Sequence, residues 1–121
     1  MTEAELTEKM SYCYGTENYY RDNMNFFLYT DGVRTFCDEA QAWWFLDIIR
    51  SLYFEHKYRK HLENDFVAIK LIVAENNTAD VVFLGDDGQK FYEQNIMFTD
   101  CPKGEWLFYL TDKVLMWNGE Y

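Results

Sequence analysis

Residues 66–74 read FVAIKLIVA, and this stretch decides the fold. Its odd-numbered positions from 67 to 73 are all Val, Ile or Leu, whereas Lys70 is the only charge among the even-numbered ones. This pattern predicts a central β-strand that is covered on at least one side. Turn-forming residues at 76–78 then predict that residues 79–84 return as a partner strand.

The remainder of the chain continues in the same way. Residues 85–88 read GDDG and predict a second turn, which leads to a strand at 90–98. Residues 106–110 and 114–117 predict a further hairpin, joined at 111–113. These connections are too short for helical crossovers, so the strands should pair mainly antiparallel.

Toward the N-terminus, two β-rich runs at 26–30 and 33–37 flank Asp31-Gly32. Such a pair is typical of a two-residue turn, so we expect a hairpin here. Residues 2–10 have helix-forming composition. Thr2 as the cap and Glu5 three positions later predict a short helix that begins with a capping box.

The clearest helical pattern covers residues of about 39–55, with Asp38 as a candidate cap and no Gly or Pro inside. Ala40, Trp44, Ile48 and Leu52 form its apolar stripe. The cations at 56–61 would follow its C-terminus, where they offset the partial negative charge of the helix; an anion or acidic-partner site is the other interpretation.

The expected fold is therefore α+β and forms a single domain over residues 1–121. A mostly antiparallel sheet of about five to seven strands carries one long helix (about 39–55) on one face, and a short helix stands at the N-terminus.

Composition excludes several classes of protein. The chain is 49% hydrophobic and 20% aromatic, which excludes a disordered chain. Twenty-one Asp and Glu against 11 Lys and Arg give a net charge of −10. Such a field repels phosphate backbones, so we expect no direct nucleic-acid binding, whereas it suits a basic protein partner.

The N-terminus lacks the basic start and apolar stretch of a secretory signal, and no run is long enough to span a membrane. We therefore expect a cytoplasmic protein without membrane association. Cys13, Cys37 and Cys101 are widely spaced and odd in number, which predicts reduced thiols. Their spacing does not match a zinc site, so no metal and no cofactor is expected.

Residues that could carry catalysis are scarce. The chain has two serines and two histidines, and no Ser-His-Asp or Cys-His pattern emerges. The GDDG turn is acidic where a phosphate-binding loop needs bare amides and a lysine. Carboxylate pairs such as Asp86 and Asp87 are expected by chance at this acidic content, so no catalytic residue is predicted.

Aromatic residues are unusually abundant, with ten Phe, ten Tyr and four Trp. Some of them must lie at the surface, where Tyr and Trp among acidic groups make good interface anchors. Ordinary packing in the core and at its boundary is the other interpretation of the same residues.

Five short blocks extend over nearly the whole chain: GTENYYR (15–21), YTDGV (29–33), AWWFLDII (42–49), FTDCP (98–102) and NGEY (118–121). In these blocks the chain resembles a small family of unknown function found in bacteria, phages and plasmids. The resemblance implies a complete single-domain protein from such a mobile-element setting. It carries no activity, cofactor or site with it.

We expect a non-enzymatic interaction protein that binds a host or mobile-element partner, with inhibition as one outcome. The predicted partner-binding residues are aromatic or charged residues within these blocks: Tyr20, Arg21, Asp31, Trp43, Asp47 and Asp100. The alternative is a small ligand-binding or enzymatic domain with an aromatic-lined pocket between helix and sheet. The chain would act as a monomer or homodimer, and exposed Trp and Tyr could meet their symmetry mates.

Overall fold

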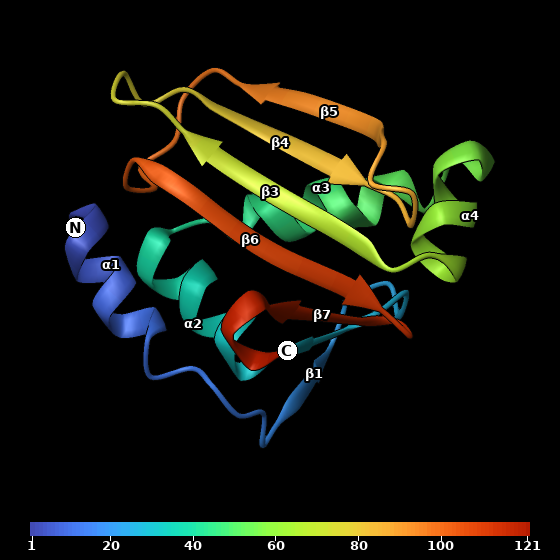
Figure 1. Ribbon diagram of the computed structural model, residues 1–121, viewed down its shortest axis with the longest axis horizontal. Coiled ribbons are helices and arrows are strands. Elements are labelled where there is room, and N and C mark those ends of the chain that lie inside the picture. Colours follow the sequence, from blue (N-terminus) through green and yellow to red (C-terminus); the bar gives the residue numbers. More distant parts are fainter.

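The computed structural model describes all residues, 1–121. In chain order its elements are α1 (Glu3–Met10), β1 (Tyr19–Arg21), β2 (Leu28–Thr30), α2 (Asp31–Ala40), α3 (Trp44–Leu52), α4 (His56–Asn64), β3 (Val67–Val73), β4 (Ala79–Leu84), β5 (Lys90–Ile96), β6 (Gly104–Thr111), β7 (Val114–Trp117) and the 3-10 helix η1 (Asn118–Glu120). The strands form one seven-stranded sheet in the order β1-β2-β7-β6-β3-β4-β5 (Figure 1). The α+β class is thus confirmed.

The stretch at 66–74 does form the centre of the sheet. β3 lies between β4 and β6 and pairs antiparallel with both. Its odd-numbered residues are all buried, as the alternation predicts. β2 and β7 pair in parallel, so the sheet is mixed although mostly antiparallel.

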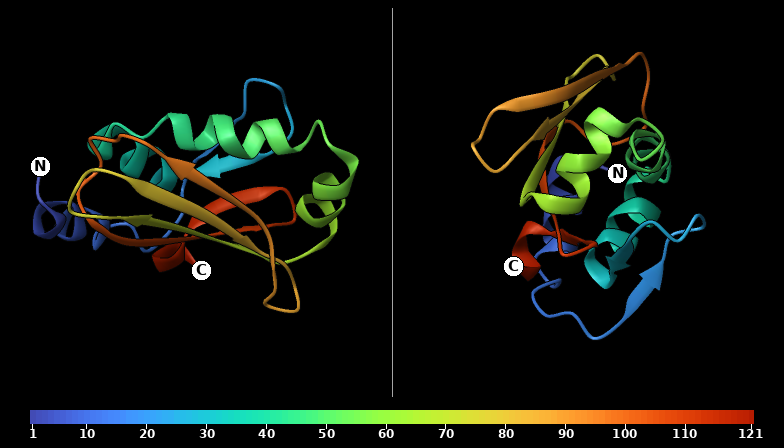
Figure 2. Two further views of the ribbon diagram at one scale, coloured as in Figure 1. Left: turned by 90° about the horizontal axis from the view of Figure 1, so that it is seen from above. Right: turned by 90° about the vertical axis from the view of Figure 1, so that its right-hand side faces the viewer.

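Helices cover only one face of this sheet. In Figure 2, left, α2 and α3 lie together on one side of the strands, whereas η1 and the C-terminus lie on the other. The covered face is filled with aromatic rings: the Phe108 ring of β6 lies 5.0 Å from Phe36 of α2 and 4.9 Å from Phe45 of α3. None of the helices has the length and apolar composition needed to cross a bilayer.

The hairpin expected at 26–30 and 33–37 is wrong. Asp31 is the first residue of α2, and the Thr30 side chain caps this helix by accepting a hydrogen bond from the Val33 N–H. The apolar residues that follow are spaced i, i+3, i+4 and i+7, which is the helical period: Val33, Phe36, Cys37 and Ala40 are all buried. Here the helical period decided the structure, and Asp31-Gly32 forms no turn.

The single long helix expected at 39–55 is also wrong. α2 ends at Ala40, because the next residue, Gln41, has a φ of 53° in the left-handed region, and α3 starts only at Trp44. The cations at 56–61 belong to a separate helix, α4, and most of them lie in its first half. They therefore do not offset the C-terminal charge of α3. The short N-terminal helix is confirmed together with its Thr2–Glu5 capping box.

Candidate interaction surface

Three aromatic side chains form a row across the edge of the molecule where β1 and β2 meet the helices. Tyr20 and Tyr29 are cross-strand neighbours, and their rings stack with centroids 5.5 Å apart. Trp43, in the connection between α2 and α3, meets Tyr29 edge-on at 6.0 Å. Both tyrosines are half-buried and Trp43 is 39% exposed, so each ring packs partly against the protein and partly faces solvent.

Charged side chains surround this row, and two of them contact its rings directly. The Arg34 guanidinium lies 4.7 Å from the centre of the Tyr20 ring, a cation–π distance. The Trp43 indole N–H donates to Asp38 Oδ1 at 2.9 Å. Beside Trp43, Asp47 pairs with Arg50, as their i, i+3 spacing on the helix predicts. We call these seven residues the aromatic surface: Tyr20, Tyr29, Arg34, Trp43, Asp38, Asp47 and Arg50.

A buried carboxylate anchors one end of the aromatic surface. The Asp22 side chain is fully buried, and its Oδ1 accepts from Arg50 Nε at 2.7 Å. Its Oδ2 accepts from the backbone N–H groups of Met24 and Phe26. Asp22 therefore ties the connection between β1 and β2 to α3, and it fixes the Arg50 guanidinium beside a small hollow of about 130 Å³ that Trp43 also lines.

The other end of the aromatic surface meets the start of α2. Asp31 Oδ1 accepts from the Tyr20 hydroxyl at 2.8 Å, and its Oδ2 accepts from the backbone N–H of Asn18 at 3.1 Å. The Tyr20 hydrogen bond is the main cause that lowers the pKa of Asp31, and the Asn18 bonds lower it further.

A second carboxylate at the start of α2 comes from the opposite end of the chain. Glu120 accepts from the Thr30 hydroxyl at 2.6 Å, from the Gly32 N–H at 3.1 Å and from the Thr16 hydroxyl at 3.0 Å. Since it also accepts from the Trp117 N–H, Glu120 joins the C-terminus to α2 and to the segment before β1.

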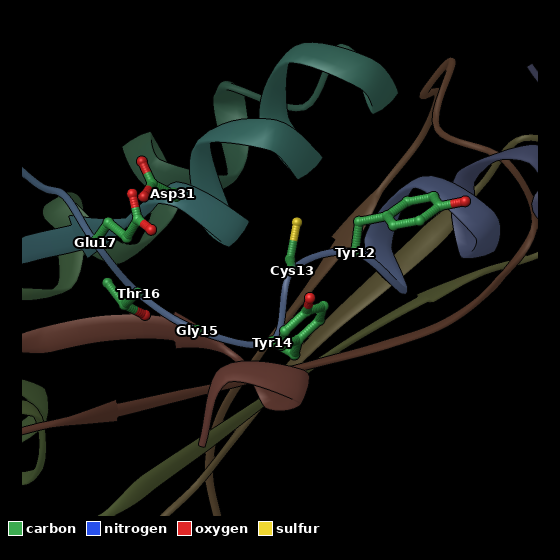
Figure 3. A pocket seen from close by; sticks show the side chains of 7 residues that line it. All are labelled: Tyr12, Cys13, Tyr14, Gly15, Thr16, Glu17 and Asp31. Atoms are coloured by element: carbon green, nitrogen blue, oxygen red, sulfur yellow. The ribbon is translucent and has the colours of Figure 1, made fainter.

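Next to Asp31 lies an open hollow of about 400 Å³ formed mainly by the segment between α1 and β1. Glu17 and Asp31 lie at one end of it and Tyr12 at the other, with Cys13 between them (Figure 3). This hollow is not the aromatic-lined pocket between helix and sheet that the alternative interpretation requires, because its walls are a surface loop and the first residue of α2.

The structure brings four of the six predicted partner-binding residues together. Tyr20, Trp43 and Asp47 belong to the aromatic surface, and Asp31 bonds to its Tyr20. Arg21 is exposed on β1 and takes no part in the contacts described above. Asp100 lies apart, in another hollow of about 430 Å³ that is lined by residues 1–3, the β3–β4 connection and the β5–β6 connection.

Sequence reasoning missed the residues that hold the aromatic surface in shape, chiefly Tyr29, Arg34 and Asp22. The sequence predicts that residues 26–30, which include Tyr29, pair with 33–37 in a hairpin that does not form. It therefore does not indicate that Tyr29 pairs with Tyr20 of β1. Asp22 stands in a polar segment, and nothing in that segment indicates that its carboxylate is buried. By contrast, the i, i+3 spacing of Asp47 and Arg50 on one helix is a local signal for such a pair.

No group of three or more His, Cys, Asp and Glu side chains is arranged to hold a metal ion. All three cysteines are free. Burial raises the pKa of the Cys101 thiol to about 12 and that of Cys37 still further, which keeps both as neutral thiols at neutral pH.

A family model described as a family of unknown function (DUF6876) matches residues 4–121. The match covers nearly the whole chain, as the five sequence blocks predict. Comparison with curated proteins and with solved structures gave no match.

Proposed function

The chain belongs to this family of unknown function, DUF6876, and from its geometry we propose that it is a non-enzymatic binding protein. Its partner is a protein that docks on the aromatic surface. The observation that carries this proposal is the row Tyr20–Tyr29–Trp43, in which three partly exposed rings touch one another and stay accessible. Tyr and Trp in such settings contribute most to binding energy at protein interfaces.

The aromatic surface is organised before any partner arrives. Arg34 is stacked on Tyr20, the Trp43 indole is hydrogen-bonded to Asp38, and Arg50 is held between Asp22 and Asp47. Each fixed side chain saves about 0.5–1.5 kcal/mol of ordering cost on association. The rings and charged groups of the aromatic surface therefore already have, in the free protein, the positions that we expect them to take in the complex.

Charge favours a basic partner. Four carboxylates and only two arginines stand on or beside the aromatic surface, which makes it net negative: Asp22, Asp31, Asp38 and Asp47 against Arg34 and Arg50. The net charge of −10 adds a long-range field that speeds the approach of a basic protein. In the mobile-element setting that the family resemblance implies, such a partner would belong to the host or the element, and occupying its surface would inhibit it.

The test is a pull-down from host lysate with the tagged chain and two variants. Trp43→Ala removes the most exposed ring of the aromatic surface, and Phe98→Ala is the matched control, because Phe98 is an exposed aromatic outside it. We expect a partner that the wild type and Phe98→Ala both capture at low salt, and that Trp43→Ala and high salt both release. Identical capture by all three chains would refute the proposal.

The hollow beside Asp31 is the one feature that favours the alternative, a ligand-binding domain. Asp31 and Glu17 are the two acidic residues that line this hollow. Both carboxylate oxygens of Asp31 already accept hydrogen bonds, one from the Tyr20 hydroxyl and one from the Asn18 N–H. A ligand would have to replace these bonds. A thermal-shift screen with small basic metabolites distinguishes the two functions, because only a ligand-binding domain should be stabilised.

A further inference from the structure

The sheet face opposite α2 and α3 has no layer of helices over it (Figure 2). We call it the open sheet face. On the three central strands it consists of the residues that alternate with the buried ones: Ala68, Lys70, Ile72, Asp80, Val82, Leu84, Glu105, Leu107 and Tyr109. An antiparallel sheet face in water normally carries polar residues. Six of these nine residues are instead apolar or aromatic.

The apolar residues of the open sheet face are contiguous across the strands. Ala68 lies between Leu84 and Tyr109, and Tyr109 is followed by Met116 of β7, so this row is apolar from β4 to β7 and ends at Lys90 of β5. In the next row, Val82 and Leu107 flank Lys70. Apolar patches of this continuity on a soluble domain mark interaction surfaces.

The charges on the open sheet face already have partners. Lys70 pairs with Glu105 at 3.9 Å and Lys90 with Glu93 at 2.8 Å, while Asp80 accepts a hydrogen bond from Asn95. Glu105 and Glu93 are thus each matched by a lysine, and only Asp80 has a neutral partner. Covering this face therefore leaves no charged group without an ion-pair or hydrogen-bond partner, and so avoids the largest cost of burying a charge.

We propose that a second copy of this chain covers the open sheet face, so that the protein is a two-fold dimer of sheets packed face to face. A two-fold contact needs a self-complementary surface, because it brings the same patch of both copies together. If one residue of the first copy contacts another residue of the second, the reverse contact forms as well. Lys70 and Glu105, of opposite sign and side by side, satisfy this: each Lys70 can face Glu105 of the other copy. This proposal does not depend on the proposed function, since it uses the other side of the sheet.

The size of the face suits a dimer. Strands β3 to β7 are four to eight residues long, and at 3.3 Å per residue and about 4.8 Å between strands they give a flat footprint of roughly 500 Å². At the C-terminal end Tyr121 packs on Tyr109 and Phe66, which extends the apolar area. Side chains add to this flat area, and because stable complexes bury ~800 Å² per partner the contact needs nearly the whole face.

The test is sedimentation velocity of the full chain from micromolar to millimolar concentration. We expect a monomer–dimer equilibrium for the wild type. Leu107→Arg places two like charges at the centre of the contact and should weaken the dimer at least about tenfold. Tyr12→Arg is the matched control, because Tyr12 is exposed on the segment after α1, and its dimer should be unchanged.

Val82→Arg is a second variant of the open sheet face, used in case Leu107→Arg fails to fold; circular dichroism and thermal melting check both. A dimer lost in the folded face variants and kept in Tyr12→Arg supports the proposal. A wild type that stays monomeric at all concentrations, or a dimer that both folded face variants retain, overturns it.

Discussion

At the scale of single residues, Asp22 is the group on which the geometry of the aromatic surface depends most. Its carboxylate is fully buried and neutralises Arg50. Asp22→Asn removes the buried negative charge and leaves that guanidinium only the exposed Asp47 as an ion-pair partner, a loss that costs about 3 kcal/mol. Urea unfolding should show this decrease, whereas Asp47→Asn, at the 72% exposed end of the same network, should change stability by less than about 1 kcal/mol. Equal effects would mean that burial of Asp22 contributes nothing.

Asp31 should make stability depend on pH. Its pKa is lowered in the folded state, chiefly by the Tyr20 hydroxyl, so it stabilises the fold above its unfolded pKa and this contribution is lost as pH falls through the folded value. The urea midpoints of wild type and Asp31→Asn should therefore differ at neutral pH and converge below about pH 4. Tyr20→Phe, which removes the main donor, should reduce the difference. A free Asp titrates at about pH 4, so a difference in urea midpoint that is the same at about pH 7 and about pH 3 would contradict this account.

At the scale of elements, strands were easier to predict than helices. β3 to β7 follow from alternation and tight turns, which are local signals. Residues 33–37 are expected to form a strand but belong to α2, because two local signals compete there. Asp31-Gly32 suggests a turn, whereas Thr30 as a cap and the period of Val33 to Ala40 indicate a helix. The break at Gln41 carries no sequence signal, since Gln is an ordinary helix residue.

Gln41 offers a direct test of that break. An L-residue with a φ of 53° is strained, and glycine is the residue that adopts this conformation without cost. Gln41→Gly should stabilise the protein by about 1 kcal/mol, and raise the melting temperature by roughly 4 °C. Gln41→Val should lower it, because a β-branched residue is least tolerant of a positive φ. A melting temperature lowered by glycine would indicate that the Gln side chain matters more than the backbone.

The start of α2 and the C-terminus are coupled through Gly32 and Glu120. Alanine in place of glycine usually stabilises a helix, but a Cβ at Gly32 would lie within 2.6 Å of Glu120 Cδ. Gly32→Ala should therefore push the Glu120 carboxylate away from the hydrogen bonds that it accepts from Thr30 and Gly32, and destabilise the protein by roughly 1–3 kcal/mol. In a Glu120→Ala background the same change should be neutral or stabilising. Additive effects in urea unfolding of the double variant would show that the two residues do not interact.

At the scale of the whole molecule, the sequence located the candidate site only partly. Composition indicated surface aromatics, and four of the six predicted residues meet in space. Asp100 does not, because the fold places the β5–β6 connection at a distance from the β1–β2 edge. The strand order decides which aromatic rings touch. In that order β1 pairs with β2, and β2 pairs with β7 from the other end of the chain. No local pattern encodes that order.

The two proposed surfaces also predict how the molecule binds as a whole. The open sheet face and the helix-covered side are opposite, so a dimer through the former leaves both aromatic surfaces free. On a sensor surface densely coated with the partner, the wild type should dissociate at least about tenfold more slowly than Leu107→Arg, because its second contact forms at a high effective concentration. At sparse coating the two should dissociate alike, since each then binds through a single Trp43-centred contact. A rate difference that persists at sparse coating would place Leu107 in the partner contact itself, and equal rates at dense coating would mean that the two aromatic surfaces of a dimer cannot engage together.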